Sequence, residues 1–396
     1  MKSIKNILSN AVASGIKEQQ NSPSNNLLNE VFEKLDLAVI VLPENSNTAA
    51  VFTKNIFCAA PIIIAKNNLP NKIRALVINS GNANAGTGVA SGELGITNAY
   101  KVCQLVADEL EIGAEKVLPF STGVIGQQLP MTCFENNIKT LINGLNETNL
   151  ENVSKAILTT DTCTKTISKT IEFNKDVITI TGMAKGSGMI RPNMATMLSF
   201  IFTDIQATQK ELQQCLEIAV NQSFNRITVD GDTSTNDACS LSTTNQSNIK
   251  LSHIKDDFQK ALNEICLDLA LKIIEDGEGA TKKIEIEVVG GATNHSPLVK
   301  IAFFASDANW GRILAAVGYS DVKNLKTENI NIYLDDVCLI KNGILDKNYT
   351  EEKGNNIMQQ QNIKVFVEIG KSTFKETVWT TDLSYDYIKI NSEYRS

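Results

Sequence analysis

The chain has 396 residues, enough for two domain-sized units, and its 42% hydrophobic and 20% charged residues are typical of a globular protein. Its net charge of -7 argues against nucleic acid or an anionic membrane as a partner, because both attract basic surfaces. No apolar run approaches the length of a membrane span, and the N-terminus lacks the apolar core of a secretory signal.

The first part of the sequence predicts short strands separated by turns. Apolar, β-branched runs at 37–42 and 75–78 are each bounded by polar turn residues, as strands are. A loop rich in glycine and asparagine is predicted at 79–88. A helix should follow this loop, because apolar residues between Ala99 and Leu110 recur at helical spacing.

The middle of the sequence predicts two strands and two helices. Residues 177–181 and 199–203 are strand-like, and residues 183–194 between them form a loop rich in glycine with one proline. The runs 209–224 and 256–275 carry apolar residues at helical spacing.

The last third of the sequence returns to strands. Residues 283–288 alternate between polar and apolar, and 330–334 and 363–369 are also strand-like. Residues 342–362 are predicted to be a surface loop. Because strands and helices do not alternate strictly, the sequence predicts an α+β protein of layered sheets and helices rather than a doubly wound parallel sheet.

One threonine, Thr196, lies between a glycine-rich loop and an apolar strand. Gly186 and Gly188 allow unusual backbone angles in this loop, and Pro192 fixes a further turn. A threonine held rigidly at this point would have its hydroxyl close to the carbonyl of Ala195. Taken alone, however, a threonine that begins a strand is far more often structural.

This position would allow self-cleavage followed by nucleophilic catalysis. Attack of the Thr196 hydroxyl on the Ala195 carbonyl would give an ester by an N-to-O acyl shift, and water would then free the Thr196 amine. An α-amino group titrates near pH ~7.7–8.0, so it can serve as the base for its own hydroxyl. Such an enzyme needs no catalytic histidine, which fits a sequence whose two histidines, His253 and His295, we expect at the surface.

The sequence predicts no metal site and no organic cofactor. The eight cysteines are scattered without a CxxC pair, which favours reduced, packed thiols in a cytosolic protein. The acidic run 230–237 resembles a calcium loop, but its twelfth position is Leu241 rather than glutamate. We interpret this run as a structural loop near the site.

Motifs spread in order along nearly the whole chain carry a family resemblance. Besides the Ala195–Thr196 junction, they lie at 15–17, 50–55, 77–85, 121–126, 223–237, 276–282, 309–314 and 389–394. Together they resemble the bifunctional ornithine acetyltransferase/N-acetylglutamate synthase family of arginine biosynthesis. The resemblance implies a layered fold of the self-processing N-terminal-nucleophile type, cut between Ala195 and Thr196.

The resemblance also implies roles for individual residues. Thr196 is the nucleophile, and Thr122 and Gly123 form the oxyanion hole. The substrate-binding positions are Thr159, Lys185, Thr196, Glu278, Asn391 and Ser396.

The resemblance implies more specific roles for three of these positions. Thr159 is preferred to Thr160, although the length of this loop varies and leaves the choice open. Lys185 is expected to pair with a substrate carboxylate, and Glu278 with the ammonium of ornithine.

The implied reaction is ping-pong acetyl transfer. Thr196 takes the acetyl group from N2-acetyl-L-ornithine and passes it to L-glutamate, and some family members also accept acetyl-CoA as donor. Cleavage would divide the chain into an α chain, 1–195, and a β chain, 196–396, which assemble as a cytoplasmic heterotetramer of two α and two β chains.

Two alternatives stay open at this point. A self-processing N-terminal-threonine amidohydrolase or aminopeptidase would use the same nucleophile but transfer the acyl group to water. A non-enzymatic binding protein would keep the loop uncut.

Overall fold

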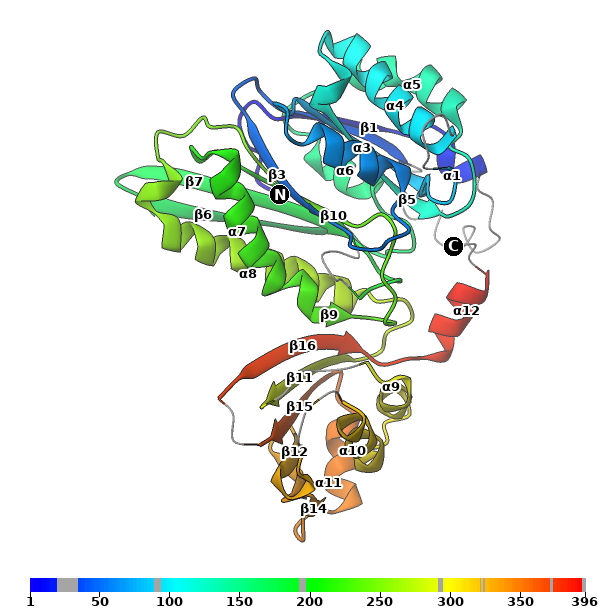
Figure 1. Cartoon of the computed structure of the whole chain (residues 1–396), viewed down its shortest axis with the longest axis vertical. Coiled ribbons are helices and arrows are strands. Elements are labelled where there is room, and N and C mark those ends of the chain that lie inside the picture. The colour runs from blue at the N-terminus through cyan, green and yellow to red at the C-terminus, as the bar shows by residue number, and fades with distance from the viewer. Residues whose placement is uncertain are drawn as a thin grey trace.

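The computed structural model describes residues 1–19, 35–88, 94–191, 197–290, 295–320, 322, 325–370 and 373–393. These residues form three β-sheets with helices packed against them, so the predicted α+β class is confirmed. Two of the sheets and their helices form the upper body in Figure 1, and the third sheet forms a lobe below it.

The first sheet has the strand order β1-β2-β4-β5. Its strands are β1 (Leu8–Val12), β2 (Leu37–Val41), β4 (Ala75–Asn82) and β5 (Val117–Val124). The β4–β5 pair is parallel and the other pairs are antiparallel. Its associated helices are α1 (Ile16–Gln19), α3 (Ala60–Asn68), α4 (Leu94–Leu110), α5 (Met131–Asn143) and α6 (Leu150–Ala156). Helices α4 and α5 cover one face, where they bury apolar side chains against the strands.

The second sheet has the strand order β3-β10-β8-β7-β6. Its strands are β3 (Asn47–Phe52), β6 (Lys165–Phe173), β7 (Asp176–Lys185), β8 (Leu198–Thr203) and β10 (Ala238–Thr243). Helices α7 (Gln209–Asn221) and α8 (Lys255–Glu275) cover its outer face.

The inner faces of these two sheets pack on each other. Phe120 of the first sheet and Phe200 of the second lie edge to face, with their ring centroids 5.1 Å apart. One apolar core contains side chains from both sheets, whereas separate cores join each sheet to its own helices. The upper body is therefore a layered stack of helices, sheet, sheet and helices, which agrees with the predicted layering.

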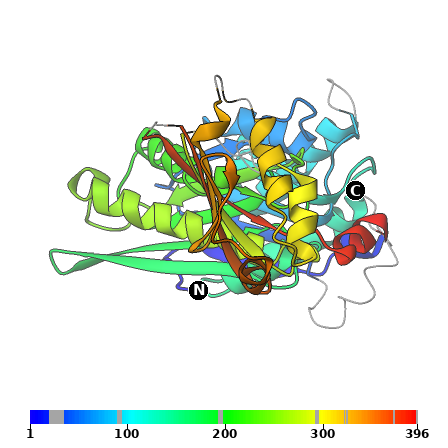
Figure 2. The same cartoon turned by 90° about the horizontal axis from the view of Figure 1, so that it is seen from below.

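The third sheet forms the lower lobe and has the strand order β14-β13-β12-β15-β11-β16-β9. Its strands are β9 (Ile227–Thr228), β11 (Lys283–Val289), β12 (Ile330–Leu334), β13 (Val337–Lys341), β14 (Ile344–Leu345), β15 (Asn362–Ile369) and β16 (Lys375–Thr381). Helices α9 (Pro297–Phe304), α10 (Trp310–Gly318) and α11 (Glu351–Met358) belong to this lobe. Figure 2 shows α9 and α10 along one face of the sheet. The last helix, α12 (Tyr385–Glu393), returns toward the upper body (Figure 1).

Three predicted loops are partly regular structure. The predicted loop 183–194 begins within β7, which extends to Lys185. Strand β4 continues to Asn82, because Asn79 and Ser80 are buried with their polar groups paired: Asn79 accepts from Ser121 and Ser80 donates to the Ala156 carbonyl. The predicted loop 342–362 contains β14 and α11. Helix α11 has a threonine N-cap and two glutamates in its first turn, both of which favour a helix start.

Candidate active site

Six of the residues predicted for the site line one cavity of about 90 Å³ in the upper body. They are Thr122, Gly123, Thr159, Lys185, Glu278 and Asn391. Met197 also lines this cavity. Ala195, Thr196 and Ser396 lie outside the described residues, so their assignments stay predictions. The site thus collects side chains that are far apart in the sequence.

The cavity lies where three strands of the two packed sheets end or begin. Strand β5 supplies Thr122 and Gly123, β7 ends at Lys185, and β8 begins at Leu198. Strands β7 and β8 are antiparallel neighbours, with Lys185 opposite Leu198. The chain between them therefore leaves and re-enters the same sheet beside the cavity.

Gly123 must be glycine for two geometric reasons. Its φ is +130°, which side chains other than hydrogen rarely tolerate. A Cβ built on it would lie 2.3 Å from the carbonyl carbon of Gly81 on the neighbouring strand. The β4–β5 register shifts after Gly81, which pairs with Gly123, because Asn82 pairs with both Thr122 and Val124. The Ser-Thr-Gly segment thus belongs to the last residues of β5.

Lys185 joins two of the predicted functional positions. Its Nζ donates to Thr159 Oγ1 at 2.8 Å and to Thr122 Oγ1 at 3.3 Å. The same nitrogen lies 3.8 Å from Asp161 Oδ2. Because the residue is only 8% exposed, its ammonium is held in the cavity wall rather than in bulk solvent. Thr122 of the predicted oxyanion hole and Thr159, predicted to bind substrate, therefore both accept a hydrogen bond from the Lys185 ammonium.

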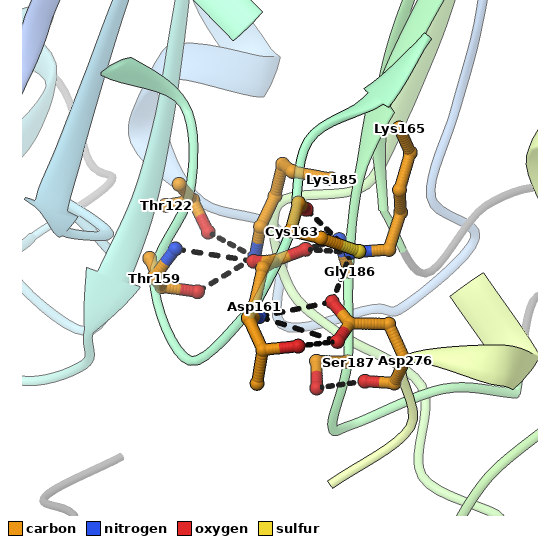
Figure 3. A network of polar contacts seen from close by, with 10 residues as sticks. Thr122, Thr159, Asp161, Cys163, Lys165, Lys185, Gly186, Ser187 and Asp276 are labelled. Carbon is orange, nitrogen blue, oxygen red and sulfur yellow. Dashed lines mark hydrogen bonds and ion pairs between the residues drawn. The ribbon is translucent and has the colours of Figure 1, made fainter. Parts of the chain in front are cut away.

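Behind Lys185 lies a buried charge cluster of Asp161, Lys165, Lys185 and Asp276 (Figure 3). Lys165 Nζ lies 2.7 Å from Asp161 Oδ1 and 2.5 Å from Asp276 Oδ2. The Gly186 amide also donates to Asp161 Oδ1, at 2.6 Å. Two lysines and two aspartates balance in formal charge, so the cluster can be buried without a net charge.

The pKa values in this cluster follow from burial and from the neighbouring charges. Burial alone would raise the pKa of Asp161, but the charges of Lys165 and Lys185 and its hydrogen bonds hold it well below its usual range. Burial alone would lower the pKa of Lys165, but the two aspartates outweigh it and raise this pKa. Asp161 and Lys165 therefore both stay charged at neutral pH because the neighbouring charges offset the effect of burial.

Glu278 and Asn391 also line the cavity. Asn391 Nδ2 donates to Glu278 Oε2 at 2.7 Å, which ties α12 to the site. Burial raises the pKa of Glu278, although hydrogen bonds from Thr160 and Asn391 act in the other direction. A Cβ on Gly188 would lie 2.2 Å from Glu278 Oε2, so glycine at 188 leaves the room that this carboxyl occupies. Thr159 contacts Lys185 and Thr160 contacts Glu278, so both threonines belong to the cavity wall.

The 230–237 loop lies at the site, as predicted, and its last four residues line the cavity. Asp230 accepts hydrogen bonds from the amides of Met189 and Ile190, which positions the loop after β7. Asn236 donates to the carbonyls of Ala83 and Ser121 and so joins this loop to the first sheet.

All eight cysteines lie among the described residues and are free thiols, as predicted, but Cys163 is exposed rather than packed. His253 is exposed, but His295 is half-buried against Gly231, so the expectation of two surface histidines is wrong for His295. Neither histidine lines the candidate cavity.

Within the described part of the chain, no helix is long and apolar enough to cross a membrane. The same residues contain no group of three or more His, Cys, Asp or Glu side chains that could hold a metal ion.

Residues 25–396 match the ArgJ family. The chain is 44% identical over 377 residues to the arginine biosynthesis bifunctional protein ArgJ of Pseudomonas fluorescens, covering 91% of this chain and 92% of that protein. The ArgJ protein of Methylococcus capsulatus is 45% identical over 377 residues, covering 91% of each chain. The chain belongs to the ArgJ family.

Among solved structures, ArgJ of Bacillus halodurans is 36% identical with a TM-score of 0.44, covering 50% of this chain and 100% of that chain. The ornithine acetyltransferase of Mycobacterium tuberculosis in complex with ornithine is 30% identical with a TM-score of 0.41, covering 48% of this chain and 93% of that chain.

In this ArgJ-family chain, sequence analysis missed several residues at or behind the site. Asp161, Lys165 and Asp276 form most of the buried charge cluster, and Asn236 and Asp237 line the cavity. Asp276, Asn236 and Asp237 lie within the motifs 276–282 and 223–237, but only their charge or polarity suggested a role. Neither spacing nor hydropathy distinguishes a buried ion pair from a solvated one.

Proposed function

We propose that the protein cleaves itself between Ala195 and Thr196 and then carries acetyl groups from N2-acetyl-L-ornithine to L-glutamate. The hydroxyl of Thr196 is the nucleophile, and its freed amine is the base. One structural observation carries the proposal: residues on both sides of the proposed cut line a single cavity, together with Met197, which directly follows Thr196.

The cavity offers a place for each charge that the reaction requires. Thr122 and Gly123 can bind the negative oxygen that develops on the acetyl carbonyl, and losing one such donor costs about 10²–10³ in rate. Lys185 can hold a substrate carboxylate beside them, because its ammonium already lies against the hydroxyls of Thr122 and Thr159. Glu278 supplies the opposite charge for an ammonium.

The two half-reactions conserve protons without an added base. Thr196 Oγ attacks the acetyl carbonyl while its amine takes the hydroxyl proton, and the amine returns this proton to the departing nitrogen of ornithine. The nitrogen of glutamate then attacks the ester and gives up a proton, which the amine passes back to Oγ. Glutamate, rather than water, therefore completes the cycle.

The fold explains how the two chains would stay together after the cut. Strands β3, β6 and β7 precede the cut, and β8 and β10 follow it, yet all five belong to one sheet. The β7–β8 pair extends from Ile180–Thr203 to Lys185–Leu198. Chains 1–195 and 196–396 should therefore co-purify. We propose their assembly as a heterotetramer of two α and two β chains in the cytoplasm.

The proposal is tested by mass and by products. Purified protein should consist of two chains that meet at Ala195 and Thr196, and it should convert N2-acetylornithine and glutamate into equal amounts of ornithine and N-acetylglutamate. Release of acetate without N-acetylglutamate would instead support an amidohydrolase. A single uncut chain without either product would support a binding protein. A parallel incubation with acetyl-CoA and glutamate tests the second donor.

Glu278 should make the use of acetylornithine depend on pH. Only the carboxylate attracts an ammonium, so kcat/KM for acetylornithine should fall as the pH drops through the raised pKa of Glu278. The protonated form could instead donate a hydrogen bond to a glutamate carboxylate, so kcat/KM for glutamate should fall less. This offers one way for the same pocket to accept both substrates.

The matching variant is Glu278→Gln, which keeps the size and the hydrogen bonding of the side chain but not its charge. It should lower kcat/KM for acetylornithine by about 10- to 100-fold at neutral pH and remove this pH dependence. The measurement is kcat/KM for both substrates as a function of pH, from neutral pH downward. Identical pH profiles for the variant and the wild type would contradict the assignment.

A further inference from the structure

Asp237 is the one carboxyl of the cavity wall with an oxygen left unpaired among the described residues. The residue directly precedes β10, is 2% exposed and lines the cavity. Its Oδ2 atom is buried and has no hydrogen-bond partner there. A buried polar atom without a partner destabilises the folded protein, so a carboxyl in this state indicates that a partner is missing.

The strand register places this carboxyl beside the proposed cut. Strands β8 and β10 are parallel, with Leu198 paired to Ala238. The preceding residues, Met197 and Asp237, are therefore neighbours, and the Ala238 amide donates to the Met197 carbonyl at 2.9 Å. The Met197 backbone also hydrogen-bonds to the Asp237 carboxyl. Met197 directly follows Thr196 in the sequence, so the carboxyl lies beside the first described residue after the proposed cut.

Among the described residues, no cation forms an ion pair with Asp237. Burial raises the pKa of Asp237 well above its usual range, against hydrogen bonds from Ser234 and Met197 and the charge of Lys185. Lys185 itself is within 4 Å of Asp161 rather than Asp237. The other titratable neighbour is the Cys58 thiol before α3, whose pKa is raised mainly by burial and partly by Asp237. The uncut chain thus holds a carboxyl without a close positive charge among the described residues.

We propose that Asp237 is a positioning residue whose carboxyl receives the α-ammonium of Thr196 once the chain is cut. The inference rests on the proposed function, because this amine exists only after cleavage. A third group that orients the base and stabilises the cation formed on it completes a nucleophile–base pair. The amine becomes an ammonium when it takes the Thr196 Oγ proton, and the Asp237 carboxylate neutralises it. The proton then leaves on the nitrogen of ornithine, so no further reactant is needed.

The test is Asp237→Asn, which keeps the shape of the side chain but cannot carry the negative charge. Asp204→Asn is the matched control: burial also raises the pKa of Asp204, which accepts from the Thr179 amide at 3.0 Å and does not line the cavity. Both variants should be cut. Asp237→Asn should lower kcat/KM by about 10- to 100-fold, within the usual contribution of acid–base groups.

The pH profile separates positioning from structural support. The rate should rise with pH as the Thr196 amine loses its proton. Without the neighbouring carboxylate the pKa of this amine falls, so in Asp237→Asn the rise should move to lower pH by about one unit. If Asp237 only supports the loop, the rate of Asp237→Asn should rise at the same pH as the rates of the wild type and of Asp204→Asn.

A second measurement uses the cut wild-type protein. The pH dependence of acylation of the Thr196 amine, followed by peptide mass spectrometry with the Met1 amine as internal reference, should give a pKa above the ordinary range of about 7.7–8.0. An ordinary or lower value would overturn the inference. The inference would also be overturned if Asp237→Asn kept the rate and the pH profile of the wild type. It would likewise be overturned if this variant stayed uncut, because the carboxyl would then act before the amine exists. An uncut wild type would instead defeat the proposed function itself.

Discussion

Thr196→Ala should remain a single chain of 43.2 kDa and should lose acetyl transfer by at least about 10³-fold. Without its hydroxyl the residue can neither attack the Ala195 carbonyl nor accept an acetyl group. Without the cut, no α-amine forms to act as base. Intact-mass analysis and assay of N-acetylglutamate in the same preparation measure both losses.

Two further variants make this result specific. Thr196→Ser keeps a hydroxyl at the same position and should still be cut. Thr327→Ala removes an exposed threonine of the lower lobe and should be cut and active as the wild type is. Complete cleavage of Thr196→Ala between residues 195 and 196 would exclude its hydroxyl as the group that cuts. Full activity of the uncut variant would exclude the free amine as the base.

Lys165→Met should destabilise the protein by about 3–5 kcal/mol, the usual cost of breaking a buried ion pair by removing one partner. The Lys165 side chain has no exposed surface and lies between Asp161 and Asp276. Methionine fills similar space but removes the cation that pairs with both carboxylates. Urea unfolding at neutral pH measures the loss, and a difference below about 1 kcal/mol would show that the cluster does not depend on this lysine.

A matched control lies four residues further along β6. Lys169 pairs with Glu264 of α8, but both side chains are more than a third exposed. Lys169→Met should therefore change the free energy of unfolding by only about 0–1 kcal/mol.

The cost of Lys165→Met should also depend on pH. The pKa of Asp161 is lower in the folded protein than in the unfolded chain, so the pair stabilises the fold above the ordinary aspartate pKa of about 3.9. This stabilisation is lost as the pH falls through the lowered pKa. The difference between wild type and Lys165→Met should therefore shrink below about pH 4.

Long periodic segments were predictable because one physical pattern dominates each of them. The 256–275 helix differs from α8 by one residue, and the 199–203 strand differs from β8 by one. Both bury a continuous apolar surface. The loop prediction failed for the last residues of β4, because residues distant in the sequence form hydrogen bonds with the buried polar side chains there.

The candidate site divides in the same way. Motifs and family resemblance were enough to name Thr122, Gly123, Lys185 and Glu278, all of which line the cavity. They could not indicate that Lys165 pairs with both Asp161 and Asp276. These two aspartates are 115 residues apart in the sequence and come together only in the fold. Long-range ion pairs leave no local pattern.

By itself, the sequence determined the family, the mixed α+β character and the chemistry expected of Thr196. Its apolar periodicity, its glycine-rich loop and its ordered motifs are local properties that can be read along one chain. Only the tertiary structure decided that Glu278 and Lys185 line one cavity and that Asp237 lies beside Met197 with an oxygen unpaired among the described residues. The physical reason is that burial and pairing set the charge of a carboxyl, and both depend on segments distant in the sequence.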